Sequence, residues 1–213
     1  MDFGMGPRRE IMFPLFGDGI FTQDGPDWRH SRELLRPHFS HRNYQKLDVF
    51  REHVDSLISN ISSNKDVVDL QPLFFRLTLD TTTAFLFAES VYSLNAAKEA
   101  GETSFAGAFN TAQAYIAKRT RLQDLYWLIG GKELTECCAV VHDFADMILD
   151  RTLDQGADKS GERDSRYRFL DAVAESTPDR EALRHQMINI LVAGRDTTAC
   201  LLSWTLSVQS PTK

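Results

Sequence analysis

Apolar residues recur at helical spacing along most of this sequence, and alternating patterns typical of strands are almost absent. Between positions 41 and 61 they fall three or four residues apart, which traces one helical face: Leu47, Phe50, Val54, Leu57, Ile58 and Ile61. The stretch 70–90 is the most apolar, and Pro72 suits the first turn of a helix. We therefore predict one helix over 41–61 and a largely buried helix within 70–90.

Two more helices are predicted over 104–118 and 132–154, with Gly130-Gly131 breaking the chain between them. In the second, one face is apolar: Leu134, Cys137, Val141, Phe144 and Ile148. The polar, glycine-containing segment 154–165 is expected to be an exposed loop, and a short helix is expected near 166–175. Residues 1–26 are rich in glycine and proline, which favours a loop.

Helix boundary signals indicate two more elements. Asp27 is a plausible N-cap and Pro37 a plausible stop, which predicts a helix over 27–36. Thr177-Pro178-Asp179 is typical of a helix start, and no further proline interrupts the pattern until Pro211. We therefore predict a long helix over 178–209 and an all-α fold.

The long helix is apolar nearly all round, which suits the interior of a larger protein. Its apolar residues include Met187, Ile188, Ile190, Leu191, Val192, Leu201, Leu202, Trp204 and Leu206. Without covering partners, the chain is expected to expose a large apolar patch and to aggregate.

Composition limits the classes of function. The 213 residues include 30 acidic and 24 basic side chains, a net charge of −6 that argues against binding nucleic acid. The three cysteines form no CxxC pair and read as free thiols. No apolar run approaches the roughly 18 to 20 residues of a membrane-spanning helix. As given, the chain has no targeting segment, so a cytosolic or membrane-associated location is expected.

One candidate site contains Trp28 and Arg32, whose i, i+4 spacing places an indole N–H and a guanidinium on one helical face. Together they could hydrogen-bond a ligand that carries a carboxylate. The alternative is a core tryptophan beside a solvated arginine. Arg29, Arg32 and Arg36 also form a basic stripe, either a solvated face or a docking surface for an acidic partner.

A second candidate site is the polar stretch "AGRDTT" within the long helix. A glycine inside a helix costs roughly 1 kcal/mol relative to alanine, so Gly194 suggests the close approach of a bulky group. The hydroxyl of Thr197 can donate to the carbonyl of Ala193, and Asp196 supplies an ionisable group beside it. These residues predict a proton-delivery groove. The alternative is a tolerated polar interruption.

The two stretches, in this order and spacing, resemble the cytochrome P-450 family of haem-thiolate monooxygenases. "WRHSR" resembles that family's C-helix motif, which implies that Trp28 and Arg32 bind a haem propionate. "AGRDTT" resembles its I-helix signature, which implies that Ala193 and Gly194 line the distal haem face. Asp196 and Thr197 would then be the catalytic acid–alcohol pair for oxygen activation.

Further stretches, including "GDGIFTQDGPDWRHSR" and "LRHQMINILVAGRDTTA", are similar to the fungal branch that hydroxylates n-alkanes and fatty acids. The resemblance implies haem as cofactor, an apolar long-chain substrate, and electrons from an NADPH-dependent flavin reductase. It implies the endoplasmic reticulum membrane as the location of intact members.

The departures from the family matter as well. The cysteine loop that ligates the haem iron occurs nowhere in the sequence, so no metal ligand is assigned to this chain. The chain therefore resembles an internal fragment, one partial domain with helices C to I that lacks the β-sheets and the ligand loop. We expect it to be inactive alone and not to bind haem with thiolate ligation. The alternative function is a non-catalytic helical interaction or regulatory module derived from such an enzyme.

Overall fold

A computed structural model describes residues 4–39, 48–61, 67–87, 90–95, 105–157, 173 and 179–209. In these ranges the regular secondary structure is helical and no strand is present, which confirms the predicted all-α class. The elements are α1 (Arg8–Phe16), α2 (Gly25–Leu35), η1 (Arg36–Phe39), α3 (Asp48–Asn60), α4 (Leu70–Phe87), α5 (Phe105–Leu122), η4 (Gln123–Leu128), α6 (Lys132–Ala157) and α8 (Arg180–Gln209).

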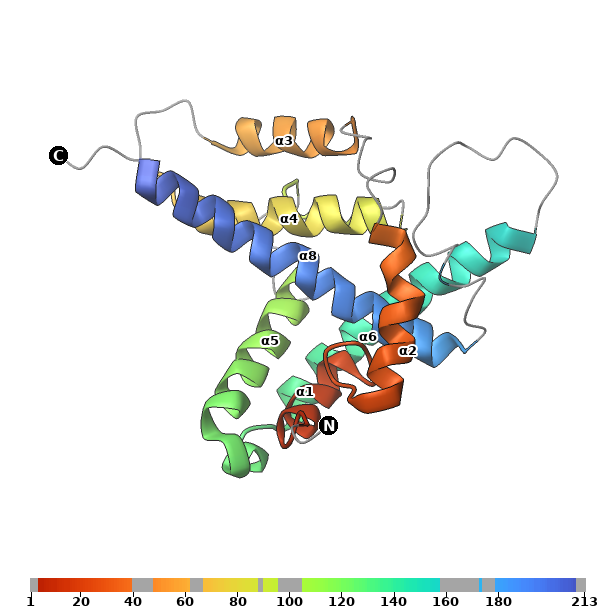
Figure 1. Ribbon diagram of the computed structural model, residues 1–213. Helices are drawn as coiled ribbons and strands as arrows, with labels where there is room; N and C mark the ends of the chain where they lie inside the picture. The colour runs from red at the N-terminus through yellow and green to blue at the C-terminus, as the bar shows by residue number, and fades with distance from the viewer. Residues whose placement is uncertain are drawn as a thin grey trace.

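Helix α8 is the central element of the fold. It crosses the middle of Figure 1 diagonally, and α4, α6 and α1 all pack against it. Its first turns are buried on nearly every side, since Leu183, Met187, Ile188 and Leu191 each expose 2% or less of their surface. The main hydrophobic core therefore forms where this half of α8 meets α1, α5 and α6.

Residues 1–26 are not all loop, because α1 forms within them, and that prediction was wrong. The helix continues past Pro14, although a proline inside a helix removes one backbone hydrogen bond. Its buried face explains this, since Ile11, Leu15 and Phe16 expose 3% or less and pack in the main core. Gly17, with a φ of 59°, ends the helix and donates its N–H to the carbonyl of Phe13.

The predicted starts of two helices need correction. Helix α2 begins at Gly25, two residues earlier than predicted, so Asp27 lies in its first turn and is not the N-cap. Helix α8 begins at Arg180, and the Asp179 carboxylate accepts the backbone N–H of Glu181 at 3.0 Å. Asp179 therefore caps the helix from outside it. The predicted cap residues at positions 177 and 178 lie outside the described residues.

The helices predicted over 41–61, 70–90, 104–118 and 132–154 are present in the described residues with shifted bounds. The described part of the 41–61 helix is α3, and most of its apolar face stays exposed, with Ile58 61% exposed. Gly131, with a φ of 109°, separates η4 from α6 as predicted. Helix α6 runs to Ala157, so 154–157 is helical rather than loop. Residues 158–165 lie outside the described ranges, as does 166–175 apart from the buried Val173.

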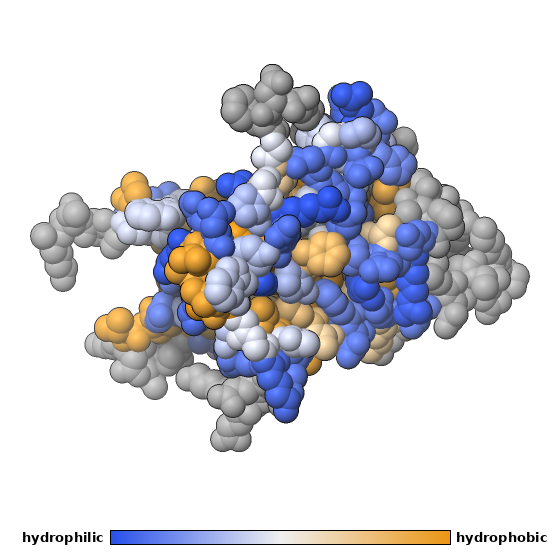
Figure 2. Space-filling model, turned by 90° about the horizontal axis from the view of Figure 1, so that it is seen from below, coloured by the Kyte–Doolittle hydropathy of each residue, from blue (hydrophilic) through white to orange (hydrophobic). Residues whose placement is uncertain are grey.

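The second half of α8 is much more exposed than the first. Leu201, Trp204 and Val208 expose 66%, 70% and 80% of their surface. On the face shown in Figure 2, hydrophobic residues lie in separate groups among hydrophilic ones. Among the described helices, none is long and apolar enough to cross a bilayer.

Candidate functional site

The structure brings Arg32, Ala193 and Gly194 together around one cavity of about 860 Å³. We call this space the Arg32 cavity. Its walls come from the loop before α2, from α2 and η1, and from α3, α4 and α8. Its lining is mostly apolar and aromatic, and includes Ile20, Phe21, Leu35, Phe39, Phe50, Phe85, Leu86 and Ile190.

Two arginines, Arg32 and Arg36, are among the residues that line this apolar cavity. Both side chains belong to exposed residues, and neither has a carboxylate partner among the described residues. The Arg32 guanidinium lies 5.5 Å from the ring centre of Trp28, a cation–π contact that follows from their i, i+4 spacing. Trp28 itself lines a neighbouring hollow of about 470 Å³, not the Arg32 cavity.

Gly194 is needed where α8 crosses α4. A Cβ at this position would lie 2.9 Å from both Cγ2 and Oγ1 of Thr82, closer than Cβ atoms are found in proteins. The close approach predicted from the sequence is therefore made by a threonine of α4. Gly194 also lines the Arg32 cavity. The same glycine therefore permits the close contact between α8 and α4 and forms part of the cavity wall.

The Thr197 hydroxyl donates to the carbonyl of Ala193 at 2.6 Å, which confirms the hydrogen bond predicted from their spacing. Thr197 is exposed and is not among the residues that line the Arg32 cavity. The next residue, Thr198, does line it. The Thr197 hydroxyl is therefore connected to the cavity wall by its hydrogen bond to the carbonyl of Ala193, a residue that lines the cavity.

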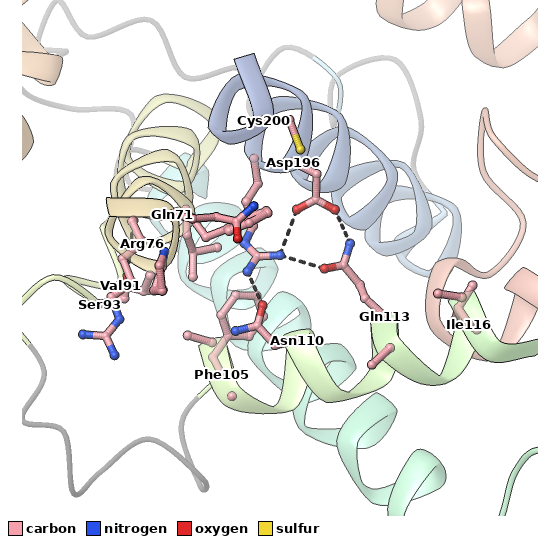
Figure 3. Close-up of a pocket in the computed structure, with 18 of the residues that line it drawn as sticks. Gln71, Arg76, Val91, Ser93, Phe105, Asn110, Gln113, Ile116, Asp196 and Cys200 are labelled. Carbon is pink, nitrogen blue, oxygen red and sulfur yellow. Dashed lines mark hydrogen bonds and ion pairs between the residues drawn. The ribbon is translucent and has the colours of Figure 1, made fainter. Parts of the chain in front are cut away.

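Asp196 lies on a different side of α8, in a cleft of about 810 Å³ lined mainly by α4, α5 and α8, which we call the Asp196 cleft. Its Oδ2 accepts the side-chain amide of Gln113 at 2.5 Å, and its Oδ1 accepts an N–H of Arg195 at 2.9 Å. Figure 3 shows the side chain of Gln113 extending from α5 toward Asp196 on α8, whereas the side chain of Asn110 bonds to Arg195. The structure thus separates Asp196 from the Arg32 cavity, although its near neighbours in sequence, Ala193 and Gly194, line that cavity.

Arg195 is a buried cation that sequence reasoning treated only as part of a polar insertion. It is 3% exposed, donates to the side chains of Asn110, Gln113 and Asp196, and lies 5.0 Å from the ring centre of Phe75. Burial lowers the pKa of its guanidinium, and the nearby Asp196 carboxylate opposes that shift. Its Nε has no hydrogen-bond partner within the described part of the chain.

Sequence reasoning also missed three polar residues of α8, namely His185, Gln186 and Asn189. Each is buried, with exposures of 6%, 4% and 0%. Burial lowers the pKa of His185, and the Arg184 guanidinium adds to that shift; Glu181 and Asp18 raise it, while His142 lowers it. A detectable signal existed, because polar side chains in an otherwise apolar helix are unusual unless they are hydrogen-bonded.

The three cysteines differ in burial. Cys138 is buried in the main core, and burial raises its pKa to about 11. Cys137 is half-buried and Cys200 is exposed in the cleft of Asp196. None of the three lines the Arg32 cavity. Across the described ranges, no three His, Cys, Asp or Glu side chains are grouped to hold a metal ion.

These features define a class of protein. A long helix separates the Asp196 cleft from an apolar cavity lined by two arginines, an arrangement suited to a sizeable apolar ligand that carries negative charge. The sequence model of the family Cytochrome P450 matches residues 9–208, and the chain belongs to that family.

Relatives and solved structures agree with this assignment. The chain is 49% identical to a cytochrome P450 of Arthroderma benhamiae, over 92% of this chain and 40% of that protein. It is 45% identical to cytochrome P450 52A5 of Candida maltosa, over 95% of this chain and 40% of that protein. It therefore spans about two fifths of the length of these relatives.

Two crystal structures show the same fold at low sequence identity. A cytochrome P450 (CYP102L1) superposes with a TM-score of 0.72 and 21% identity, over 98% of this chain and 46% of that one. The cytochrome P450DA heme domain superposes with a TM-score of 0.68, also at 21% identity, over 97% of this chain and 45% of that one.

Proposed function

We propose that this chain forms the distal part of the haem pocket of a monooxygenase. The observation that supports this most directly is the Arg32 cavity, an apolar space lined by two arginines for which the described residues supply no carboxylate partner. Haem, the cofactor of the cytochrome P450 family, combines a large apolar ring with two propionates. The residues that line the cavity match both parts.

The arginines and their neighbours each have a physical role in this proposal. Arg32 and Arg36 would hold the anionic propionates, and charge-assisted hydrogen bonds of this kind are about twice as strong as neutral ones. Trp28 orients the Arg32 guanidinium through their cation–π contact. Ala193 and Gly194 line the cavity and would leave room for dioxygen, because alanine carries only a methyl group and glycine has no side chain.

Haem supplies the iron centre at which dioxygen is activated, and proton delivery falls to this chain's own residues. Thr197 lies one helical turn from Ala193 and bonds to its carbonyl, so its oxygen could hold a water near the cavity wall. In its cleft, Asp196 would take up protons from solvent, while Gln113 and Arg195 hold its carboxylate. A proton on Asp196 would then travel past Thr197 to reach the cavity.

The finer assignments follow from the resemblance and the relatives. The proposed substrate is a long-chain alkane or fatty acid, hydroxylated at a C–H bond, which suits the aromatic and aliphatic lining of the Arg32 cavity. The proposed electron donor is an NADPH-dependent flavin reductase. The proposed location is the endoplasmic reticulum membrane, as for intact members of the fungal branch.

The test is a titration of the 213-residue protein with ferric protoporphyrin IX, followed by the Soret absorbance of the bound form. Replacing Arg32 with alanine is expected to weaken binding about tenfold, because one charge-assisted hydrogen bond contributes roughly 1.5 kcal/mol or more. Arg29→Ala is the matched control, since Arg29 lies on the same helix and does not line the cavity. Equal affinities in the two variants would contradict the proposal.

A second measurement tests the iron ligand. The reduced, carbon-monoxide-bound form of the 213-residue protein is expected to lack the Soret band of a thiolate-ligated haem, because no cysteine lines the Arg32 cavity. A thiolate-type band would show that one of the three cysteines reaches the iron. This chain alone is accordingly proposed to be inactive.

A further inference from the structure

The loop of residues 17–23, between α1 and α2, is held against α8 by side chains of that helix. The backbone N–H of Ile20 donates to Oε1 of Gln186 at 3.2 Å. The backbone N–H of Phe21 donates to Oδ1 of Asn189 at 2.9 Å. Two successive amides of the loop are therefore satisfied by residues more than 160 positions later in the chain.

The two side chains that accept these amides are themselves fixed. The amide nitrogen of Asn189 donates to the carbonyls of Phe16 at 2.9 Å and His185 at 2.7 Å. The amide nitrogen of Gln186 donates to the hydroxyl of Ser31 at 2.7 Å, so it also ties α2 to α8. Buried polar groups that have all their partners are rigid, because every movement breaks a hydrogen bond in a site of low polarity.

Two glycines allow the loop to lie directly on these side chains. A Cβ at Gly17 would lie 1.9 Å from Cδ2 of His185, and a Cβ at Gly19 would lie 2.3 Å from Nδ2 of Asn189. His185 also accepts the backbone N–H of Asp18 on its Nδ1 at 3.1 Å. The loop thus follows the surface of α8 and donates three backbone N–H groups to it, those of residues 18, 20 and 21.

The same loop residues form a wall of the Arg32 cavity. Ile20 and Phe21 line it from the loop, and Ala193 and Gly194 line it from α8. The side chains that hold the loop therefore belong to the helix that supplies another wall. Helix α8 forms one wall of the cavity and also holds the loop that forms another. The separation between these two walls therefore depends on the side-chain amides of Gln186 and Asn189.

We propose that Gln186 and Asn189 are positioning residues that set the width of the Arg32 cavity and so select the ligand that fits it. They do this by fixing the backbone of Ile20 and Phe21 and touch no ligand themselves. The inference rests on the proposed function in one respect: the ligand whose fit is measured is a haem.

The test uses Gln186→Leu and Asn189→Leu, which remove the amide groups and keep roughly similar volume. Gln186→Glu is the rescue variant, because a carboxyl at this position still accepts the Ile20 N–H. Ser93→Ala is the control, since the Ser93 hydroxyl donates to buried Asp80 at 2.7 Å and does not line the Arg32 cavity. This control shows how much of any faster amide hydrogen exchange, or of any weaker binding, comes only from a lower global stability.

The first measurement is amide hydrogen exchange at Ile20 and Phe21 in the 213-residue protein. We expect about tenfold faster exchange in each leucine variant, because loss of one buried hydrogen bond permits local opening. Exchange at Ile20 in Gln186→Glu should stay within about threefold of the parent protein. Unchanged exchange in the leucine variants would overturn the proposal, whatever their affinity for haem.

The second measurement is the affinity for ferric protoporphyrin IX. The leucine variants are expected to bind it about tenfold more weakly, whereas Gln186→Glu and Ser93→Ala should bind like the parent. Faster exchange together with unchanged affinity would overturn the link between the loop and the cavity. If the parent does not bind the porphyrin, the proposed function fails, and faster exchange at Ile20 and Phe21 still supports the positioning of the wall.

Discussion

Replacing Gly19 with alanine is expected to destabilise the protein by steric conflict with a single side chain. The added Cβ would lie 2.3 Å from Nδ2 and 2.6 Å from Cγ of Asn189. Asn189 cannot turn away freely, because it is fully buried and its side chain makes three hydrogen bonds, to Phe16, Phe21 and His185. The φ angle of Gly19 lies outside the left-handed region, so backbone strain adds nothing.

The size of the effect follows from those hydrogen bonds. To relieve the contact, either the 17–23 loop or the Asn189 side chain must move, which breaks two or three of the bonds. A net contribution of about 1 kcal/mol each, with a further penalty for any buried group left unpaired, gives about 2–4 kcal/mol in the free energy of unfolding. A loss of this size is a large fraction of the stability of an ordinary domain.

A double-mutant cycle measures the effect directly. Denaturant unfolding followed by circular dichroism would compare Gly19→Ala, Asn189→Ala, the double variant and the parent. In the Asn189→Ala background the clashing atoms are gone, so Gly19→Ala should cost less than about 1 kcal/mol. The expected coupling free energy is therefore about 2 kcal/mol or more in magnitude.

The control is Gly130→Ala. A Cβ at Gly130 meets nothing within 4 Å, and its φ is not in the left-handed region, so it should change stability by about 0.5 kcal/mol or less. If Gly19→Ala costs the same with and without the Asn189 side chain, the reasoning from the contact between the loop and α8 is refuted.

Four further predictions concern other buried and exposed groups. Because burial lowers the pKa of His185, its contribution to stability is complete above pH 6.5 and is lost as the pH falls below 6.5 toward that lowered pKa. Urea unfolding should therefore show a weaker pH dependence in His185→Gln. Arg195→Lys should destabilise the chain by about 1–3 kcal/mol in the same assay, because an ammonium cannot replace the several directed hydrogen bonds of the guanidinium. Towards a thiol reagent at pH 8, exposed Cys200 should react first and Cys138 last, since Cys138 is buried and its pKa is raised to about 11. Trp204→Lys should reduce aggregation in light scattering because Trp204 is 70% exposed, and a parent protein that is monomeric and melts cooperatively would contradict this.

The sequence alone was sufficient to predict the helical class and the approximate position of most helices. Helical periodicity is local, so α4, α5 and α6 could be recognised from residues a few positions apart. The hydrogen bond between Thr197 and Ala193 was predictable for the same reason, since it spans one helical turn. Local signals failed for α1, where Pro14 opposes a helix and only burial of Leu15 and its neighbours in the core stabilises it.

The sequence also identified which residues to consider as a site, but not how they are divided in space. The motif "AGRDTT" places Gly194, Asp196 and Thr197 within four positions, yet α8 turns about 100° per residue. Gly194 therefore lines the Arg32 cavity, whereas Asp196 lines its own cleft and accepts a hydrogen bond from Gln113 of α5. Which side meets the cavity was decided by the packing of α4 on α8 and by hydrogen bonds between α5 and α8, because these contacts join residues far apart in sequence.

The same reason explains why the contact between the 17–23 loop and α8 could not be predicted. Asn189 reads locally as a polar residue in an apolar helix, and its partners Phe16 and Phe21 lie 173 and 168 positions away. The sequence by itself determined the helices, the candidate residues and the family resemblance, because those depend on short-range spacing. Tertiary structure decided which of those residues share a cavity and which polar groups are satisfied, because long-range pairings form only when the chain folds.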